Sequence, residues 1–153
     1  MILFIGQRME HERAQNHAVH SGSECAFATT LLASSEGLYG TGIVLILGEG
    51  NQLVCQAVEL LGKSLIGQEI GELMASFGAV TQRLAQDPQL HRLGPQKGVV
   101  HLALASLTNA CFDLWAKARG VPLWRLLLGL TPQAVANLLD FSYLEDVLPR
   151  EEA

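Results

Sequence analysis

Residue types that bind metals gather at one place in this sequence, near its N-terminus. His17 and His20 are three positions apart, and Cys25 follows them. An HxxH pair can place two imidazoles on one helical turn, but a structural zinc site needs four ligands in tetrahedral geometry. No fourth ligand stands at a matching spacing, and no apolar helical period surrounds the pair. We therefore interpret the group as a solvated loop and predict no metal ligand or cofactor site within this chain.

A second candidate for chemistry is Asp113, which lies in a long apolar segment. A buried carboxyl group can serve as a general base because burial raises its pKa. However, Lys117 follows at the four-residue spacing at which opposite charges pair on a helix, and Asn109 precedes at the same spacing. A structural ion pair therefore explains Asp113 better than catalysis does. Since no GxSxG or family-type cysteine motif offers a nucleophile, we predict no catalytic residue here.

A third candidate is the short segment Gly48, Glu49 and Gly50, which follows an apolar run and precedes an amphipathic helix. Glycine-rich backbone of this kind can approach a ligand closely. An ordinary turn between a strand and a helix explains the same three residues. Both interpretations stay open, and these residues are our candidates for a substrate-contacting loop.

Composition indicates one globular unit and excludes several kinds of partner. The 153 residues are 49% hydrophobic and 16% charged, which is ample material for a core. The formal net charge of −5 without a run of Lys or Arg argues against nucleic acid as a partner. Three widely spaced cysteines without a CxxC pair argue against a disulfide framework and favour a reducing cytoplasm. No apolar run has the length of a signal-peptide core or a membrane span, so we expect no membrane partner.

The N-terminal half predicts a hairpin followed by helices. Residues 7–24 are polar and lack a period, so we expect a loop there. Two β-prone runs within 25–47 flank a Ser-Glu-Gly turn, which predicts a β-hairpin. Asn51 is expected to cap a helix that ends around 62–67, and a second helix is expected over 68–86, before Asp-Pro.

The C-terminal half predicts a long central helix over 99–120 and a short one after Pro122. The polar residues of the long helix fall on one ridge, which we expect to be a buried polar network; they are Ser106, Asn109, Asp113 and Lys117. Large residues on the apolar stripes are expected in the core; they are Met74, Phe77, Trp115 and Trp124. The apolar run 136–144 has strand length, and a charged tail follows it.

Four segments carry a resemblance to a known family. They read GLYGTGIVLILGEG over 37–50, GPQKGVVHLA over 94–103, NACFDLWAK with GVPLWRLL over 109–127, and LDFSYLEDVL over 139–148. These segments resemble the L-fuconate dehydratase subgroup of the mandelate racemase and muconate lactonizing branch of the enolase superfamily. The resemblance runs from about Cys25 to the last residue.

The resemblance implies an α+β fold, a β-hairpin meander packed on a three-helix bundle, with an orphan first strand of a truncated (β/α) barrel after it. It divides the chain into a divergent segment 1–24, a capping domain 25–133, and a barrel start 134–153. Without barrel neighbours the strand must fray, dock elsewhere or self-associate.

The implied activity is that of a lyase of carbohydrate-acid catabolism, which removes water from a sugar acid with Mg²⁺. The family's metal ligands and catalytic bases lie on later barrel strands, and a barrel needs about 250 residues. We therefore expect a capping fragment that is inactive alone, whose partner is a missing or separate barrel. Substrate recognition differs, because Ser23 and Glu24 stand where the family's substrate loop has Tyr-Ser. The rival hypothesis is a non-catalytic interaction or dimerisation module. A cap without its barrel should present a contiguous exposed apolar patch, and a patch-free monomer would argue against both a partner and a missing barrel.

Overall fold

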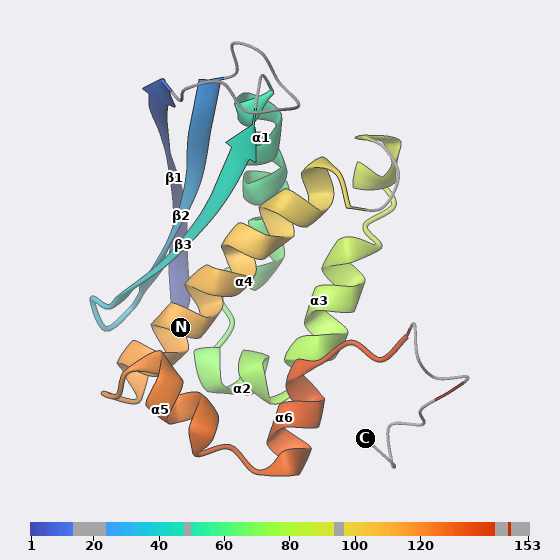
Figure 1. Ribbon diagram of the computed structural model, residues 1–153. Coiled ribbons are helices and arrows are strands. Elements are labelled where there is room, and N and C mark those ends of the chain that lie inside the picture. Colours follow the sequence, from blue (N-terminus) through green and yellow to red (C-terminus); the bar gives the residue numbers. More distant parts are fainter. Residues whose placement is uncertain (14–23, 48–49, 94–96, 143–146, 148–153) are drawn as a thin grey trace.

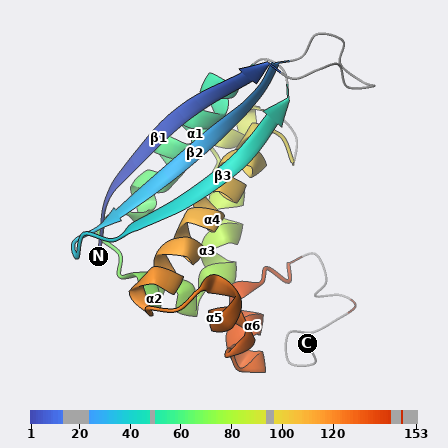
Figure 2. The ribbon, with the colours of Figure 1, turned by 60° about the vertical axis from the view of Figure 1, so that its left-hand side comes forward.

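The structure is a computed structural model, and it describes residues 1–13, 24–47, 50–93, 97–142 and 147. A three-stranded sheet lies on one side and helices cover one of its faces (Figure 1). Figure 2 shows the sheet curving over the two helices α1 and α4. The predicted α+β class, a hairpin-based sheet on a helical layer, is confirmed.

The sheet is antiparallel in the order β1-β2-β3. Its strands are β1 (Ile2–Arg13), β2 (Glu24–Ser34) and β3 (Tyr39–Leu47). The predicted hairpin is correct, and Gly37 supplies the positive φ of 77° that its turn requires. The predicted loop over 7–24 is wrong at 7–13 and at Glu24, because β1 and β2 pair there from Gln7 opposite Thr30 to Arg13 opposite Glu24. Backbone pairing forms that strand without an apolar period in its sequence.

The first helix, α1 (Asn51–Gly62), begins differently from the prediction. Gly50 is the N-cap residue at φ 99°, and no side chain caps this helix. Asn51 is inside the helix and 8% exposed, and within the described part of the chain its Oδ1 accepts no hydrogen bond. A short 3-10 turn, Lys63–Leu65, continues α1.

The single helix predicted over 68–86 is two helices, α2 (Ile70–Ala75) and α3 (Phe77–Ala85). The break is at Ser76, whose φ of −133° and ψ of 34° are not helical. The apolar period continues across it because both helices face the same core. Glu69 caps α2 by accepting a hydrogen bond from the backbone N–H of Glu72.

A second 3-10 turn, Leu90–Leu93, precedes the central helix α4 (Val99–Ala118), which was predicted correctly. By length and composition α4 could cross a membrane, but half of its apolar window is buried and it is the core helix here. Gly120 ends it with a positive φ of 65°, as expected. Trp115 lies in the core, whereas Trp124 on the next helix is 64% exposed, so its predicted core position is wrong.

The chain then forms α5 (Leu123–Leu128) and α6 (Pro132–Leu138). The strand predicted over 136–144 is therefore wrong at 136–138, and the described residues 139–142 are not strand either. Thr131 caps α6 by accepting from the N–H of Ala134. The helix packs on α2 and α3, where Gly78 lies directly against the carbonyl of Leu139. The proposed division at residue 133 falls inside α6; whether 134–153 begins a separate unit stays a prediction.

Close packing of α4 on β3 depends on two glycines. A Cβ at Gly40 would collide with the carbonyl oxygen of Ala110, and one at Gly42 with that of Ser106. Without side chains at these positions the helix backbone approaches the strand directly. The sequence pattern GTG at 40–42 therefore fixes the distance between the two layers.

Candidate functional site

The register of the sheet brings two loop segments to the same end of the molecule. Arg13 is opposite Glu24, so the segment 14–23 connects β1 and β2 there. Cys25 is opposite Leu47, so the segment that leads to α1 begins at this same end. The predicted candidates Gly48 and Glu49, like His17 and His20, lie outside the described residues.

Gly50 is the candidate that the structure describes, and it joins this loop end to the N-terminus of α1. It is exposed, with φ 99°, and its carbonyl oxygen accepts the N–H of Leu53 at 2.9 Å. The first turn of α1 contains no acidic residue. The positive end of this helix dipole is therefore not compensated from within the helix, which favours an anionic group nearby. A carboxylate is one group of this kind.

No metal centre is built from the described residues. Within that part of the chain, no three His, Cys, Asp or Glu side chains lie close enough to hold a metal ion. The described residues therefore do not fit a magnesium ion, which needs several oxygen ligands around it.

The polar ridge of α4 holds the helix against strand β3 by hydrogen bonds. The carboxylate of Asp113 accepts from the N–H of Thr41 at 2.7 Å and from Lys117 Nζ at 2.6 Å, which confirms the predicted ion pair. Lys117 Nζ also donates to the carbonyl of Tyr39 at 2.8 Å. These bonds occupy backbone groups of the outer strand β3, which would otherwise be free to pair with another chain.

Burial along this ridge is uneven, unlike the uniformly buried network we predicted: Ser106 is buried, Asp113 is half-buried, and Asn109 and Lys117 are exposed. Ser106 is fully buried, and its hydroxyl pairs with Thr30 Oγ1 at 2.7 Å and donates to the carbonyl of Gly42 at 3.1 Å. Asn109 is exposed and donates a long 3.4 Å bond to the carbonyl of Ile43. The ridge follows the edge strand β3, so only Ser106 lies beneath the sheet, and a helical wheel cannot indicate this difference.

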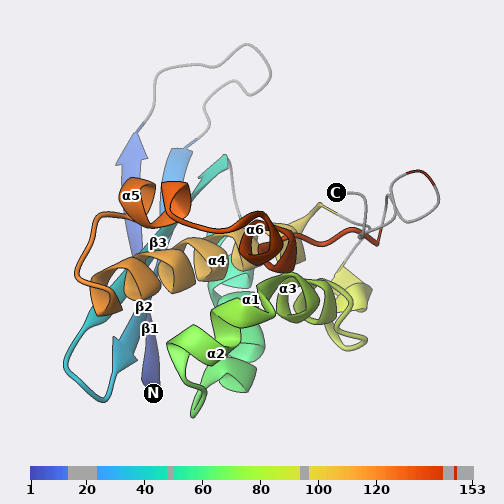
Figure 3. The same ribbon diagram turned by 90° about the horizontal axis from the view of Figure 1, so that it is seen from below.

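An apolar groove that the sequence did not reveal lies where α3, α4, α5 and α6 meet. Its volume is about 590 Å³. Figure 3 shows α6 beside α3, with α5 crossing near α4. Phe77 and Phe112 form its floor in an edge-to-face contact with centroids 5.4 Å apart. Leu128, 81% exposed, lies at its rim. Apolar surface of this kind is expected both of a cap without its barrel and of an interaction module, so the groove does not distinguish the two.

Comparison with known proteins adds independent findings. The family described as "Mandelate racemase / muconate lactonizing enzyme, N-terminal domain" matches residues 3–129. "Mitochondrial enolase superfamily member 1" of Bos taurus is 41% identical over 138 residues, which are 89% of this chain and 31% of that protein. "L-galactonate dehydratase" of Hypocrea jecorina is 34% identical over 142 residues, 93% of this chain and 32% of that protein. The chain thus spans about a third of the length of these relatives.

Solved structures of related proteins have the same fold as this chain. The crystal structure of human mitochondrial enolase superfamily member 1 superimposes with a TM-score of 0.89 at 32% identity, over 98% of this chain and 36% of that one. L-talarate/galactarate dehydratase from Salmonella typhimurium, solved with Mg and L-lyxarohydroxamate, gives a TM-score of 0.66 at 18% identity, over 82% of this chain and 33% of that one. At that identity the likeness shows the fold alone.

Proposed function

Because the chain belongs to the mandelate racemase/muconate lactonizing enzyme N-terminal domain family of the enolase superfamily, we propose that it is the capping part of an acid-sugar dehydratase of the L-fuconate dehydratase type. Its relatives include an L-galactonate dehydratase, which supports an acid sugar as the substrate class. The choice of L-fuconate rests on the sequence motifs described above.

The observation that carries the proposal is that the strand ends bounding two connecting segments lie at one end of the sheet. Arg13 and Glu24 bound one loop, and Leu47 and Gly50 bound the other. In an assembled enzyme these loops cover the substrate, and Gly48, Glu49 and Gly50 contact it. The positive end of α1 lies beside Gly50 and suits the carboxylate of a sugar acid.

The chain supplies substrate enclosure but no catalytic group. Mg²⁺, its carboxylate ligands and the proton-transferring bases come from a barrel that the chain does not include. The apolar groove supports a partner of this kind, because it adjoins α6, the last described helix, and the matched region is only 32% of the L-galactonate dehydratase. Burying its exposed rim against that partner would remove apolar surface from water.

A chimera tests this function. The chain replaces the matching 142-residue region of the Hypocrea jecorina L-galactonate dehydratase, and Mg²⁺-dependent loss of water is measured with L-fuconate and L-galactonate. We expect dehydration by the chimera and none by the chain alone. A folded chimera that dehydrates no acid sugar would overturn the proposal.

Two glycine variants of the chimera locate the site. Gly50→Ala and Gly37→Ala both place a side chain on a positive φ, so both carry a similar backbone strain. Only Gly50 is at the loop end; Gly37 is in the turn at the opposite end. We expect Gly50→Ala to lower kcat/KM about tenfold or more, as small misplacements in an active site do, and Gly37→Ala to leave it unchanged. Equal losses would argue against substrate contact at Gly50.

The alternative is a non-catalytic interaction or dimerisation module that keeps this fold. The exposure of Leu128 at the groove and of Trp124 on the same helix α5 favours it, because large exposed apolar side chains mark partner surfaces. Sedimentation of the chain alone distinguishes the two. Specific dimers that persist at low concentration favour the module, whereas a monomer that associates only with a barrel favours the capping part.

A further inference from the structure

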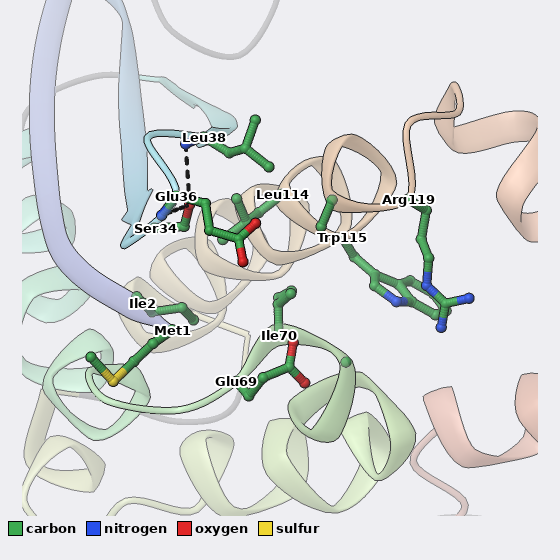
Figure 4. Close-up of a pocket in the computed structure, with 12 residues that line it drawn as sticks. Met1, Ile2, Ser34, Glu36, Leu38, Glu69, Ile70, Leu114, Trp115 and Arg119 are labelled. Atoms are coloured by element: carbon green, nitrogen blue, oxygen red, sulfur yellow. Dashed lines mark hydrogen bonds between the residues drawn. The ribbon is translucent and has the colours of Figure 1, made fainter.

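A second hollow lies at the opposite end of the sheet from the two loops. It has a volume of about 190 Å³ and is enclosed by the β2–β3 turn, the start of α2 and the end of α4. Figure 4 shows charged side chains from these three places around it. Ile2, Ile70 and Leu114 provide apolar walls. This hollow shares no lining residue with the apolar groove.

One wall carries hydrogen-bond donors. Trp115 is 6% exposed, and its indole Nε1–H has no acceptor within the described part of the chain. A buried N–H without an acceptor is costly, so such groups normally have a partner. In Figure 4 the indole nitrogen is on the edge of the ring that faces α2.

Beside it, the guanidinium of Arg119 lies over the Trp115 ring, 5.8 Å from the ring centroid. No ion pair of the described residues includes Arg119. The donors of this wall therefore suit a carboxylate, which accepts from a guanidinium and from a second N–H at once.

The facing walls carry negative charge. Glu36 belongs to the turn, where its backbone N–H donates to Ser34 Oγ at 3.3 Å, and Figure 4 shows its carboxylate directed towards the hollow. Glu69 lines it from the start of α2, and backbone hydrogen bonds from Gly71 and Glu72 hold the pKa of its carboxyl below the usual range. The side chains of the lining carry two carboxylates and one guanidinium, and the N-terminal ammonium of Met1, which also acts on Glu69, brings the sum of charges to zero. A ligand of zero net charge therefore matches the hollow, with its anionic group on the guanidinium wall and its cationic group towards the two carboxylates.

We propose that this hollow is a binding site for a small zwitterion of the α-amino-acid class, with its carboxylate on Arg119 and Trp115 and its ammonium between Glu36 and Glu69. The volume limits the ligand. A cavity of about 150 Å³ holds benzene, so this one holds a molecule of about seven or eight non-hydrogen atoms, the size of valine. The site is independent of the proposed dehydratase function, because it lies at the other end of the sheet from Gly50.

The test follows the indole N–H signals of the full chain by NMR. The sequence contains two tryptophans, and the Trp124→Phe variant assigns their signals. L-Valine is compared with 3-methylbutanoate, which lacks the ammonium, and with 2-methylpropylamine, which lacks the carboxylate. We expect L-valine to shift the Trp115 signal saturably, with at least tenfold weaker binding of the other two, and to leave the Trp124 signal unmoved. A Trp115 signal that none of the three shifts, or that 3-methylbutanoate shifts at equal concentration, overturns the proposal.

Charge variants separate the site from non-specific binding. Arg119→Gln and Glu36→Gln should each weaken L-valine binding about tenfold or more, the usual effect of removing a charge-assisted hydrogen bond. The matched control is Arg125→Gln, on the exposed side of α5 and outside the lining, which should bind as the parent does. Glu69 is left unchanged because it caps α2. Equal weakening by Arg125→Gln would refute the assignment.

Discussion

Replacing Gly42 by alanine tests whether the spacing between helix α4 and strand β3 depends on the absence of a side chain at this position. The added Cβ would collide with the carbonyl oxygen of Ser106 and lie 2.6 Å from the backbone nitrogen of Ala110. Both are backbone atoms of α4, so no side-chain rotation relieves the collision. The helix must move away from β3 as a unit, or the strand must bend.

The expected cost has two parts. Overpacking in a close-packed core costs about 1 to 3 kcal/mol. Moving α4 also separates Ser106 Oγ from the carbonyl of Gly42, now 3.1 Å away, and disturbs the buried pair with Thr30. A buried polar group left without its partner costs about 1 to 3 kcal/mol. Together these give about 2 to 6 kcal/mol, a large share of the roughly 5 to 15 kcal/mol that stabilises a protein.

Urea unfolding of the full chain measures this free energy, with Gly129→Ala as the matched control. Gly129 has right-handed helical backbone angles, and the nearest atoms to a Cβ there are 3.5 Å away, which is ordinary contact. Alanine at that position is expected to be neutral or to stabilise by up to about 1 kcal/mol, since it restricts the unfolded chain. If Gly42→Ala came within about 1 kcal/mol of Gly129→Ala, the argument that Gly42 sets the spacing would be refuted.

Three further predictions concern α4. Ser106→Ala and Thr30→Val should each cost about 1 to 3 kcal/mol in urea unfolding, because each removes the buried 2.7 Å hydrogen bond between the two hydroxyls. The double variant should cost less than the sum, because that bond can be lost only once; strict additivity would contradict the pairing. Asp113→Leu should lower stability by about 1 to 3 kcal/mol, because the N–H of Thr41 loses its acceptor. Asn109→Leu should cost less than about 1 kcal/mol, because Asn109 is exposed. Similar melting temperatures for the two variants would argue against this difference. Burial raises the pKa of the Cys111 thiol from 9.0 to about 12. Above pH 9 the unfolded chain therefore loses this proton while the folded chain keeps it. The free energy of unfolding should fall as pH rises from about 9 towards 12. Cys111→Ala should lack that part of the decline in pH-dependent urea unfolding, and an unchanged pH profile would contradict it.

Elements with strong local signals were predictable from sequence. The turn with Gly37 fixes the hairpin, and the apolar residues of 99–118 require a buried helix whatever surrounds it. Gly120 follows the end of α4 and Pro122 precedes α5, and each position depends only on the residue's own backbone preference. These predictions succeed because their cause is within a few residues of their effect.

The predictions were wrong where residues distant in the sequence determine the local structure. The strand over 7–13 forms because β2 offers backbone partners, and its polar sequence gives no sign of it. Residues 136–138 have the composition of a strand, but they form the end of α6, which Thr131 caps and which packs on α3. Trp124 fits an apolar stripe, yet it is exposed because α5 presents that side to solvent in the described structure.

The candidate site was predictable only in part. The sequence indicates glycine-rich backbone at 48–50 and shows which chemistry is missing, since no residue pattern for catalysis is present. The register of the sheet decides that the strand ends bounding this segment and the β1–β2 connection lie at the same end of the sheet. The hollow beside Trp115 was not predictable, because its walls come from residues such as Glu36 and Arg119 that are 83 positions apart.

The sequence by itself determined the family, the α+β class and the positions of most helix boundaries, because motifs, periodicity and breakers act locally. Tertiary structure alone decided which groups meet. Gly42 is an ordinary strand glycine until α4 is placed on it, and Asp113 is an ordinary helical carboxylate until Thr41 donates to it. The physical reason is that packing and hydrogen bonding act over a few ångströms in space, at any separation along the chain.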